Sequence, residues 1–487
     1  MSSRALIFWV YTIAFLGIIT ACQPPTLKSD TNRDYISTQR GLAIQADMSP
    51  RIEQLLNTQG LPSVTIVAFD AKEVIWAEAF GHANLAQNAP ATLETVYTTG
   101  STFKVIVATA VMQLVEAGKI GLDDPINSYL SIPIADFSDQ GRPLTIRHML
   151  AHRSGLENAR KDGATDIWSR RNAPSLTDQI SQLRSVTDPG EKYDYCNVCF
   201  LLFTDMIQNV TGQNLESYLR DKILIPVGSQ NTAPLYPDAS MTEMMALPYE
   251  QIRGRPYPVA QKFLDTWQAG DTYLRPLDMA AFLQSHLKDG PEGDNKILSE
   301  KYVRMMREPQ FGGEITLGFS SSYEEDVQVL WWDGGTRGGS VIYELEPVNG
   351  IGVYIASNSN NSHHHLHNIA LRIRDMMRNE DEAFDYEIEK VDKLEPFLAT
   401  REELTAYTGS YVIEGAGFEL AINILGDGLA LTNPAGERIR LVMLTNKEAA
   451  LIGTGERIIF EQGETGDVSA LVLKSGDSSF SAKKRPA

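Results

Sequence analysis

The sequence predicts an α+β protein in which helices flank an antiparallel sheet, with an all-helical subdomain and a small all-β barrel domain at the end of the chain. Strand-like runs occur before residue 100 and again between residues 328 and 357, and a long helical region separates them. Short strand-like runs broken by turn residues fill the chain after Pro396. Strands and helices that are segregated in this way are typical of α+β folds.

The predicted sheet begins with a hairpin. Residues 63–69 and 74–80 are apolar or alternating runs, and the polar residues 70–73 separate them. Further strands are predicted at 328–332, 341–345 and 351–357, and Asn349-Gly350 favours a tight hairpin between the last two.

Helical spacing begins at Ser101 and continues to Ala117, where Gly118 provides a stop. Residues from about 120 to 270 combine helical patterns with Pro and Gly turns, and another helix is predicted at 363–378. A charged stretch at 379–396 predicts a solvated linker. The expected organisation is therefore a leader at 1–22, a tether at 23–45, a main domain at 46–378, the linker, and a β domain at 397–487.

The first residues predict targeting. Arg4 precedes an apolar run at 5–19, which is shorter than the roughly 20 residues of a membrane span and suits a signal peptide. The run Ile19-Thr20-Ala21-Cys22 resembles the lipobox of bacterial lipoproteins, which implies an acylated Cys22, a membrane anchor and a cell-envelope location. An ordinary cleaved signal or an uncleaved anchor is the alternative.

Charge and cysteine content exclude some functions. The 487 residues carry a formal charge of -19, which repels phosphate backbones, so nucleic acid is not an expected partner. Cys196 and Cys199 have the C-x-x-C spacing of redox sites or of half a zinc site, but no second pair completes four thiolates. We therefore expect two buried thiols at a helix start.

Ser101 and Lys104 are candidates for nucleophilic catalysis. Residues at i and i+3 share a helical face, so the Lys104 amine can reach the Ser101 hydroxyl. A serine hydroxyl needs a base beside it, and a lysine acts as a base only when burial lowers its pKa. Apolar neighbours at 103 and 105–107 supply such a setting.

Two further segments can complete this site. Tyr195 and Asn197 follow a Pro-Gly turn, and a phenol that is partly phenolate beside a lysine can shuttle a proton. Asn197 can hydrogen-bond the lysine or a substrate amide. A core tyrosine and a turn asparagine are the alternative interpretation.

The third segment is the glycine-rich run 331–339. Its glycines, Gly335 among them, allow close approach of a substrate, and a backbone N–H here could join that of Ser101 in an oxyanion hole. A phosphate-binding loop is disfavoured because no Gly-Lys-Ser/Thr follows. Trp331 and Trp332 either line a pocket or pack in the core.

Taken together, these segments resemble the serine beta-lactamase-like superfamily, which includes class C beta-lactamases, DD-peptidases, D-aminopeptidases and beta-lactamase-like esterases. The resemblance covers about residues 45–378 and rests on segments 98–104, 146–156, 195–212, 269–280, 317–319, 331–339 and 357–358. It implies an acylated Ser101, Lys104 and Tyr195 as the proton-transfer pair, and the N–H of Thr336 as oxyanion donor. Residues 404–411 look like the β-barrel domain appended to some of these hydrolases.

Asp333 departs from the family pattern, which usually has Lys or His at this point to help bind a substrate carboxylate. A carboxylate would repel that group unless Arg337 compensates. We therefore expect an esterase, amidase or peptidase acting on small-molecule esters, amides or peptides. A beta-lactamase or DD-carboxypeptidase, or a catalytically impaired lipid-anchored binding module, are the alternatives.

No cofactor or metal is expected. His363 and His367 have i, i+4 spacing, but no His-Glu-x-x-His motif accompanies them, and a solvated helix start explains them better. A Ser-His-Asp triad is disfavoured because Gly-x-Ser-x-Gly is absent from the sequence.

Overall fold

The computed structural model describes residues 34–485 except 135–140, 158–163, 167–174, 230–242, 261, 265–266, 288–296, 361, 379–382, 389–390, 392, 394–396, 398, 414–417, 435, 464–466 and 477. The predicted signal segment and Cys22 lie outside the described residues. Within them, no helix combines the length and apolar character needed to cross a bilayer.

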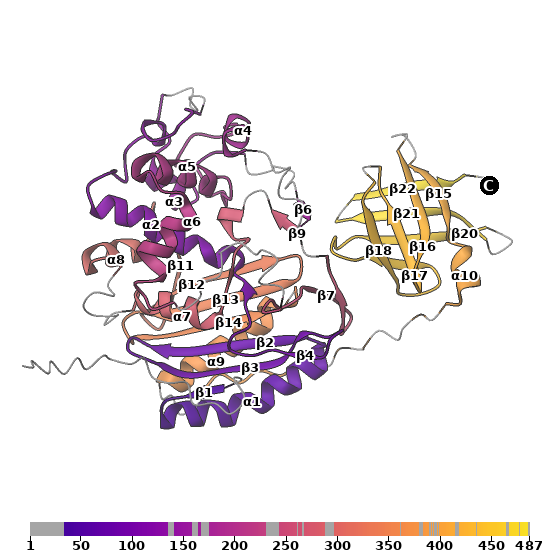
Figure 1. The fold of residues 1–487 in the computed structure, drawn as a ribbon, viewed down its shortest axis with the longest axis horizontal. Helices are drawn as coiled ribbons and strands as arrows, with labels where there is room; N and C mark the ends of the chain where they lie inside the picture. Colours follow the sequence, from indigo (N-terminus) through magenta and orange to yellow (C-terminus); the bar gives the residue numbers. More distant parts are fainter. Residues whose placement is uncertain are drawn as a thin grey trace, which may run out of the picture.

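An antiparallel eight-stranded sheet forms the centre of the main domain (Figure 1). Its order is β1-β3-β2-β14-β13-β12-β11, with β4 paired to β3. The strands are β1 (Asp34–Ile36), β2 (Ser63–Asp70), β3 (Val74–Asn84), β4 (Ala89–Pro90), β11 (Ser320–Glu324), β12 (Val327–Thr336), β13 (Gly339–Glu346) and β14 (Ile351–Ser357). Both predicted hairpins are confirmed, and β14 pairs with β2 to join the two halves of the sheet.

Helices cover both faces of this sheet. Helices α1 (Gln39–Gln59) and α9 (His363–Arg378) pack on one face, against residues such as Ile66 and Ile355. Neighbouring strand residues such as Val67 and Phe69 point to the opposite face, because side chains alternate along a strand. The helices α2 (Lys104–Glu116), α3 (Ile146–Leu150), α4 (Leu176–Ser181), α5 (Cys199–Thr211), α6 (Leu215–Leu219), α7 (Pro276–Gln284) and α8 (Glu300–Arg307) lie on that side. The predicted α+β class is thereby confirmed.

Short paired strands interrupt the helical region. They are β5 (Tyr97–Thr98) with β10 (Tyr273–Leu274), β6 (Ala164–Asp166) with β9 (Lys262–Leu264), and β7 (Tyr249–Ile252) with β8 (Arg255–Pro258). The predicted all-helical subdomain therefore also contains small two-stranded sheets.

Two expectations about the connecting segments need correction. Strand β1 and the first residues of α1 lie inside the stretch 23–45 that was expected to be a tether, because β1 pairs with β3. In the predicted linker, Tyr386 and Ile388 are partly buried against the core beneath α1 and α9. Their apolar side chains give this segment a packing role that its charge pattern did not indicate.

The end of the chain forms a closed barrel, as predicted. Its elements are α10 (Arg401–Thr405), β15 (Gly409–Ile413), β16 (Glu419–Leu425), β17 (Gly428–Thr432), β18 (Arg438–Met443), β19 (Glu448–Leu451), β20 (Arg457–Gln462), β21 (Val468–Ser475) and β22 (Ser478–Lys484). Pairing of β15 with β22 closes the barrel around its own apolar core. Ile252 and Val259 of the main domain pack against Leu444 and Ile452 of the barrel.

Candidate active site

Ser101 lies in a tight 3-10 turn, Gly100–Phe103, that leads directly into α2. The first nine residues of α2 are all buried, so this helix runs through the core. Gly100 adopts φ 48°, and a Cβ added there would lie 2.7 Å from the carbonyl carbon of Gly334. Only glycine fits this close approach, and it brings the Ser101 turn against the end of β12.

The Lys104 amine lies beside the Ser101 hydroxyl. Its Nζ is 3.0 Å from Ser101 Oγ, and it also donates a hydrogen bond to the carbonyl oxygen of Ala269. Lys104 is only 2% exposed, and burial places its pKa well below the ordinary lysine value. The carbonyl oxygen of Ala269 does not carry the full negative charge that would hold the amine protonated, so burial shifts Lys104 towards the neutral form that can act as a base.

The lowered pKa of Lys104 links folding to pH. Between the lowered pKa in the folded chain and the ordinary value of 10.5, the unfolded chain binds more protons than the folded chain. Wild-type stability relative to the Lys104→Met variant is therefore expected to rise with pH through this window. Urea unfolding of both proteins at several pH values measures the difference, and a difference that falls as pH rises would contradict it.

Tyr195 approaches Ser101 from the other side. Its phenol donates a hydrogen bond of 2.5 Å to Ser101 Oγ, and its ring lies 4.9 Å from Lys104 Nζ. Burial raises the pKa of Tyr195 above its usual value, although hydrogen bonds with the Ser101 and Trp332 side chains oppose the shift. The group is thus a phenol at neutral pH, and the partial phenolate suggested by the sequence is not supported.

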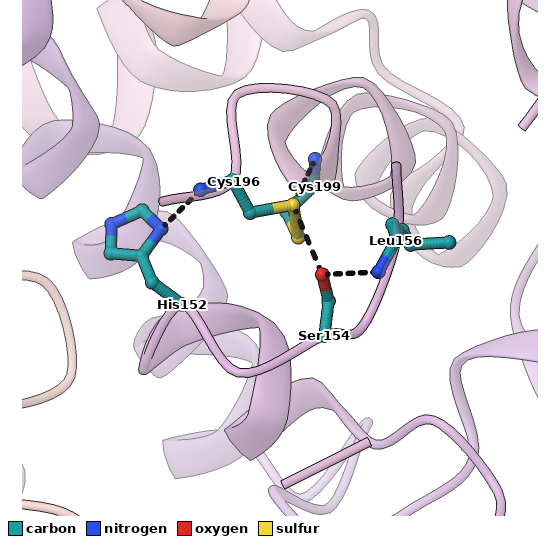
Figure 2. Close-up of a disulfide and its surroundings, with 5 residues drawn as sticks. All are labelled: His152, Ser154, Leu156, Cys196 and Cys199. Carbon is teal, nitrogen blue, oxygen red and sulfur yellow. Dashed lines mark hydrogen bonds between the residues drawn. A yellow bond between two sulfur atoms is a disulfide. The ribbon is translucent and has the colours of Figure 1, made fainter. Parts of the chain in front are cut away.

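Tyr195 is held by a segment without regular secondary structure, so its neighbours must fix its position. His152 is the main one, with its ring centre 4.7 Å from that of Tyr195. The Cys196 N–H donates a 3.0 Å hydrogen bond to His152 Nδ1 (Figure 2). Burial, assisted by the charge of Lys104, lowers the pKa of His152 to about 3, so the ring stays neutral. The sequence contained His152 in segment 146–156 but gave no reason to connect it with Tyr195.

Cys196 and Cys199 form a disulfide, which corrects the expectation of two free thiols (Figure 2). Both residues are buried, and Ser154 Oγ lies 3.3 Å from Cys196 Sγ. The disulfide therefore ties the residue after Tyr195 to the first residue of α5. The sequence could not reveal it, because C-x-x-C spacing alone also fits reduced thiols.

Removing this disulfide is expected to destabilise the fold modestly. A cross-link that closes so short a loop contributes roughly 2 kcal/mol in the chain-entropy model. The double variant Cys196→Ser/Cys199→Ala should lose about this much free energy of unfolding in urea. Reductant should lower the midpoint of the wild type only, and equal sensitivity of both proteins would rule out the disulfide.

Strand β12 supplies the opposite wall, and Trp332 is its residue in contact with Tyr195. The two rings stack with centres 5.9 Å apart, and their side chains are hydrogen-bonded. Asp333 is exposed and borders a second hollow that Trp332 does not reach. The sequence pointed to Asp333 as the residue at the place of the family's Lys or His, whereas in the structure the neighbouring Trp332 is the β12 residue in contact with Tyr195. The described ion pairs do not include one between Asp333 and Arg337.

The strand register also changes the expected oxyanion donor. Thr336 pairs with Gly339 across the two-residue turn 337–338, and such a closing pair exchanges both backbone hydrogen bonds. The N–H of Thr336 is therefore directed to β13, whereas that of Gly335 faces the Ser101 side. A Cβ placed on Gly100 would lie 3.0 Å from the Gly335 nitrogen. The register therefore favours the N–H of Gly335 over that of Thr336 as an oxyanion donor. Gly334 and Gly335 lie near the end of β12.

A cavity of about 340 Å³ opens at Ser101. It is lined by Ser101, Tyr193, Tyr195, Ile315, Ser320, Trp331, Trp332, Asp333, Gly335 and His363. Neither lysine nor arginine is among these lining residues, so the wall carries a carboxylate and aromatic rings without a fixed cation. Asn197 is half-buried and does not belong to this lining, so its predicted substrate contact stays a prediction.

The histidines of α9 have other partners than a metal. His363 Nε2 lies 2.9 Å from the Gly334 carbonyl oxygen, and His367 Nδ1 lies 2.6 Å from Glu344 Oε1. Within the described part of the chain, no three His, Cys, Asp or Glu side chains are grouped to hold an ion.

Comparison with known proteins shows the family to which the chain belongs. The profile of the family described as Beta-lactamase matches residues 48–375. The chain belongs to this family. The family has the beta-lactamase fold, and relatives such as an unguisins hydrolase are named as hydrolases. The chain is therefore a serine hydrolase with this fold.

This Beta-lactamase family protein is similar in sequence to several curated proteins. Penicillin-binding protein 4 of Amycolatopsis lactamdurans is 27% identical, with 64% of this chain and 84% of that protein covered. Putative penicillin-binding protein PbpX of Bacillus subtilis is 25% identical over 56% of this chain and 65% of its own length. Unguisins hydrolase ungD' of Aspergillus campestris is 25% identical, with 66% of this chain and 62% of that protein covered. The last two matches span a little less than two thirds of those proteins.

Solved structures share the fold. A penicillin-binding protein homologue from Pyrococcus abyssi has a TM-score of 0.56 at 20% identity, covering 90% of this chain and 99% of that one. D-amino acid amidase from Ochrobactrum anthropi has a TM-score of 0.58 at 20% identity, covering 71% of this chain and 100% of that one. These likenesses support the fold.

Proposed function

We propose that this protein forms an acyl-enzyme at Ser101 and hydrolyses small esters or amides that lack a carboxylate near the scissile bond. The observation that carries the proposal is that Ser101 Oγ lies 3.0 Å from a buried amine and 2.5 Å from a half-buried phenol. A hydroxyl held between a base and an acid is the arrangement that acyl transfer requires.

The proton donors and acceptors around Ser101 are sufficient for acyl transfer. A neutral Lys104 has one lone pair and two N–H groups, so it can accept the Ser101 proton while still donating to Ala269. The Ser101 oxygen then attacks the carbonyl carbon, and its proton moves to Lys104. The phenol of Tyr195 gives its proton to the leaving group and regains one from Lys104. In deacylation, water takes the place of the leaving group: it attacks the acyl carbonyl and passes a proton through Tyr195 to Lys104. Lys104 then returns a proton to Ser101 Oγ as the ester bond breaks and the acid leaves.

The charge that develops on the carbonyl oxygen needs backbone donors. The N–H of Ser101 and that of Gly335 are suited to this task, since a Cβ on Gly334 would lie only 2.6 Å from the Ser101 nitrogen. Both N–H groups belong to the backbone of regular elements, the 3-10 turn and β12, so they need little reorganisation as the charge forms.

The lining of the cavity supports neutral or cationic substrates. Asp333 and the aromatic rings border it, and no lysine or arginine among its lining residues would neutralise a substrate carboxylate. Penicillins and peptidoglycan peptides carry such a carboxylate, so they are the less favoured substrates.

Labelling with a fluorophosphonate probe tests the nucleophile. The wild type and a Ser181→Ala control should become labelled, whereas Ser101→Ala should not. Ser181 is an exposed serine on α4, so the control matches the chemical change without touching the site. Absence of covalent labelling in the wild type would instead favour the impaired binding module.

Steady-state hydrolysis separates the substrate classes. Short-chain p-nitrophenyl esters should be turned over with a higher kcat/KM than nitrocefin. Faster turnover of nitrocefin would reverse this preference and favour the beta-lactamase alternative.

We also propose an envelope location with a lipid anchor on Cys22. A disulfide is typical of oxidising compartments, and the lipobox-like run supplies the anchor. The wild type should sediment with membranes, and Cys22→Ala should not. Sedimentation of both proteins would contradict the lipid anchor.

A further inference from the structure

A second hollow adjoins the Ser101 cavity across the edge of β12. It has a volume of about 540 Å³ and shares Trp331, Asp333 and His363 with the first cavity. Because the same three residues line both, a substrate whose carbonyl reaches Ser101 can extend its remaining part over Trp331 into the second hollow.

The floor of this second hollow is apolar. Val329 and Ile342 are almost fully buried beneath it, and the half-buried Trp331 forms its side towards Ser101. Ser322, Glu324, Glu344, His364 and His367 complete the lining together with Asp333 and His363. An aliphatic or aromatic chain laid over this floor would displace water from apolar surface, which favours binding.

The carboxylates around the second hollow differ in whether they form ion pairs. Glu324 and Glu344 both form ion pairs with Arg374, which is fully buried behind them. Asp333 is exposed, and none of the ion pairs among the described residues includes it. No lysine or arginine lines either hollow in this part of the chain. Asp333 is thus the carboxylate available to a ligand, at the junction of the two cavities.

We propose that the second hollow binds an ammonium-bearing tail of the substrate, with Asp333 and the face of Trp331 as its recognition groups. This inference rests on the proposed acyl-enzyme function and narrows its substrate class to esters or amides of amine-containing acids or alcohols. A cation over an indole face and beside a carboxylate gains from both interactions. His363, His364 and His367 supply the remaining polar rim.

Matched esters test this subsite. Each carries a trimethylammonium group, its neutral tert-butyl isostere, or a carboxylate at one distance from the scissile carbonyl. One series places this group in the acyl part and the other in the alcohol part. In at least one series, the wild type should prefer the cationic ester to the isostere by about tenfold in kcat/KM, which corresponds to one good cation–π or ion contact. The carboxylate ester should be the poorest substrate.

Variants at Asp333 test whether this residue causes the preference for the cationic ester. Asp333→Asn should bring the ratio of cationic to neutral turnover close to one, and Asp333→Lys should invert the preference towards the carboxylate. Asp326→Asn makes the same charge change in the turn before β12, seven residues away, and should keep the wild-type ratio. The left-handed φ of 69° at Asp326 also suits asparagine.

The outcomes separate this inference from the proposed function. Equal turnover of the three esters in both series, with loss of all turnover in Ser101→Ala, would overturn the ammonium subsite and leave the hydrolase intact. A preference that survives in Asp333→Asn would also overturn it. Absence of Ser101-dependent turnover would instead defeat the proposed function.

Discussion

Replacing Lys104 with methionine is expected to lower kcat/KM for a p-nitrophenyl ester by about a thousandfold, because general-base catalysis contributes roughly 10² to 10⁴ in rate. Methionine has similar length and no lone pair that can take the Ser101 proton. Its apolar side chain suits a site that is only 2% exposed, so the fold should persist. Steady-state kinetics with the purified variant measures the loss.

Two further lysine variants make this test specific. Lys104→Arg keeps a basic side chain, but the guanidinium stays protonated at all accessible pH values, so this variant should be as inactive as the methionine variant. Lys119→Met removes an exposed lysine just after α2 and should keep full activity. Activity of Lys104→Met within tenfold of the wild type would mean that another group acts as the base.

Replacing Tyr195 with phenylalanine is expected to lower kcat by about a hundredfold with little change in KM. The change removes only the hydroxyl that bonds Ser101 Oγ at 2.5 Å. The ring keeps its packing against His152 and Trp332, so the cavity should keep its shape. A loss confined to kcat follows because the phenol acts on the proton that moves during bond formation and cleavage.

Tyr218→Phe is the matched control, since Tyr218 is a buried tyrosine of the helical region away from the Ser101 cavity. This variant should behave as the wild type. Should Tyr195→Phe raise KM strongly while kcat is unchanged, the phenol would be a binding group and not part of proton transfer.

Much of the fold was accessible from the sequence. The hairpins, the buried helix after Ser101 and the closed barrel were predicted because period-2 and period-3.6 patterns report which face of an element is buried. The tether was predicted too long because β1 is only three residues, and so short a strand has no pattern of its own. Its pairing with β3 is a tertiary event.

The sequence by itself determined that Ser101 and Lys104 would meet, because one helical turn separates them and local geometry fixes their distance. Only the tertiary structure decided that Tyr195 lies beside them, since 94 residues separate it from Ser101. It also decided that Trp332 faces the phenol while Asp333 borders the neighbouring hollow, and that the Gly335 N–H faces Ser101. A shift of one residue in strand register reverses each of these orientations, and no local pattern in a glycine-rich run fixes that register.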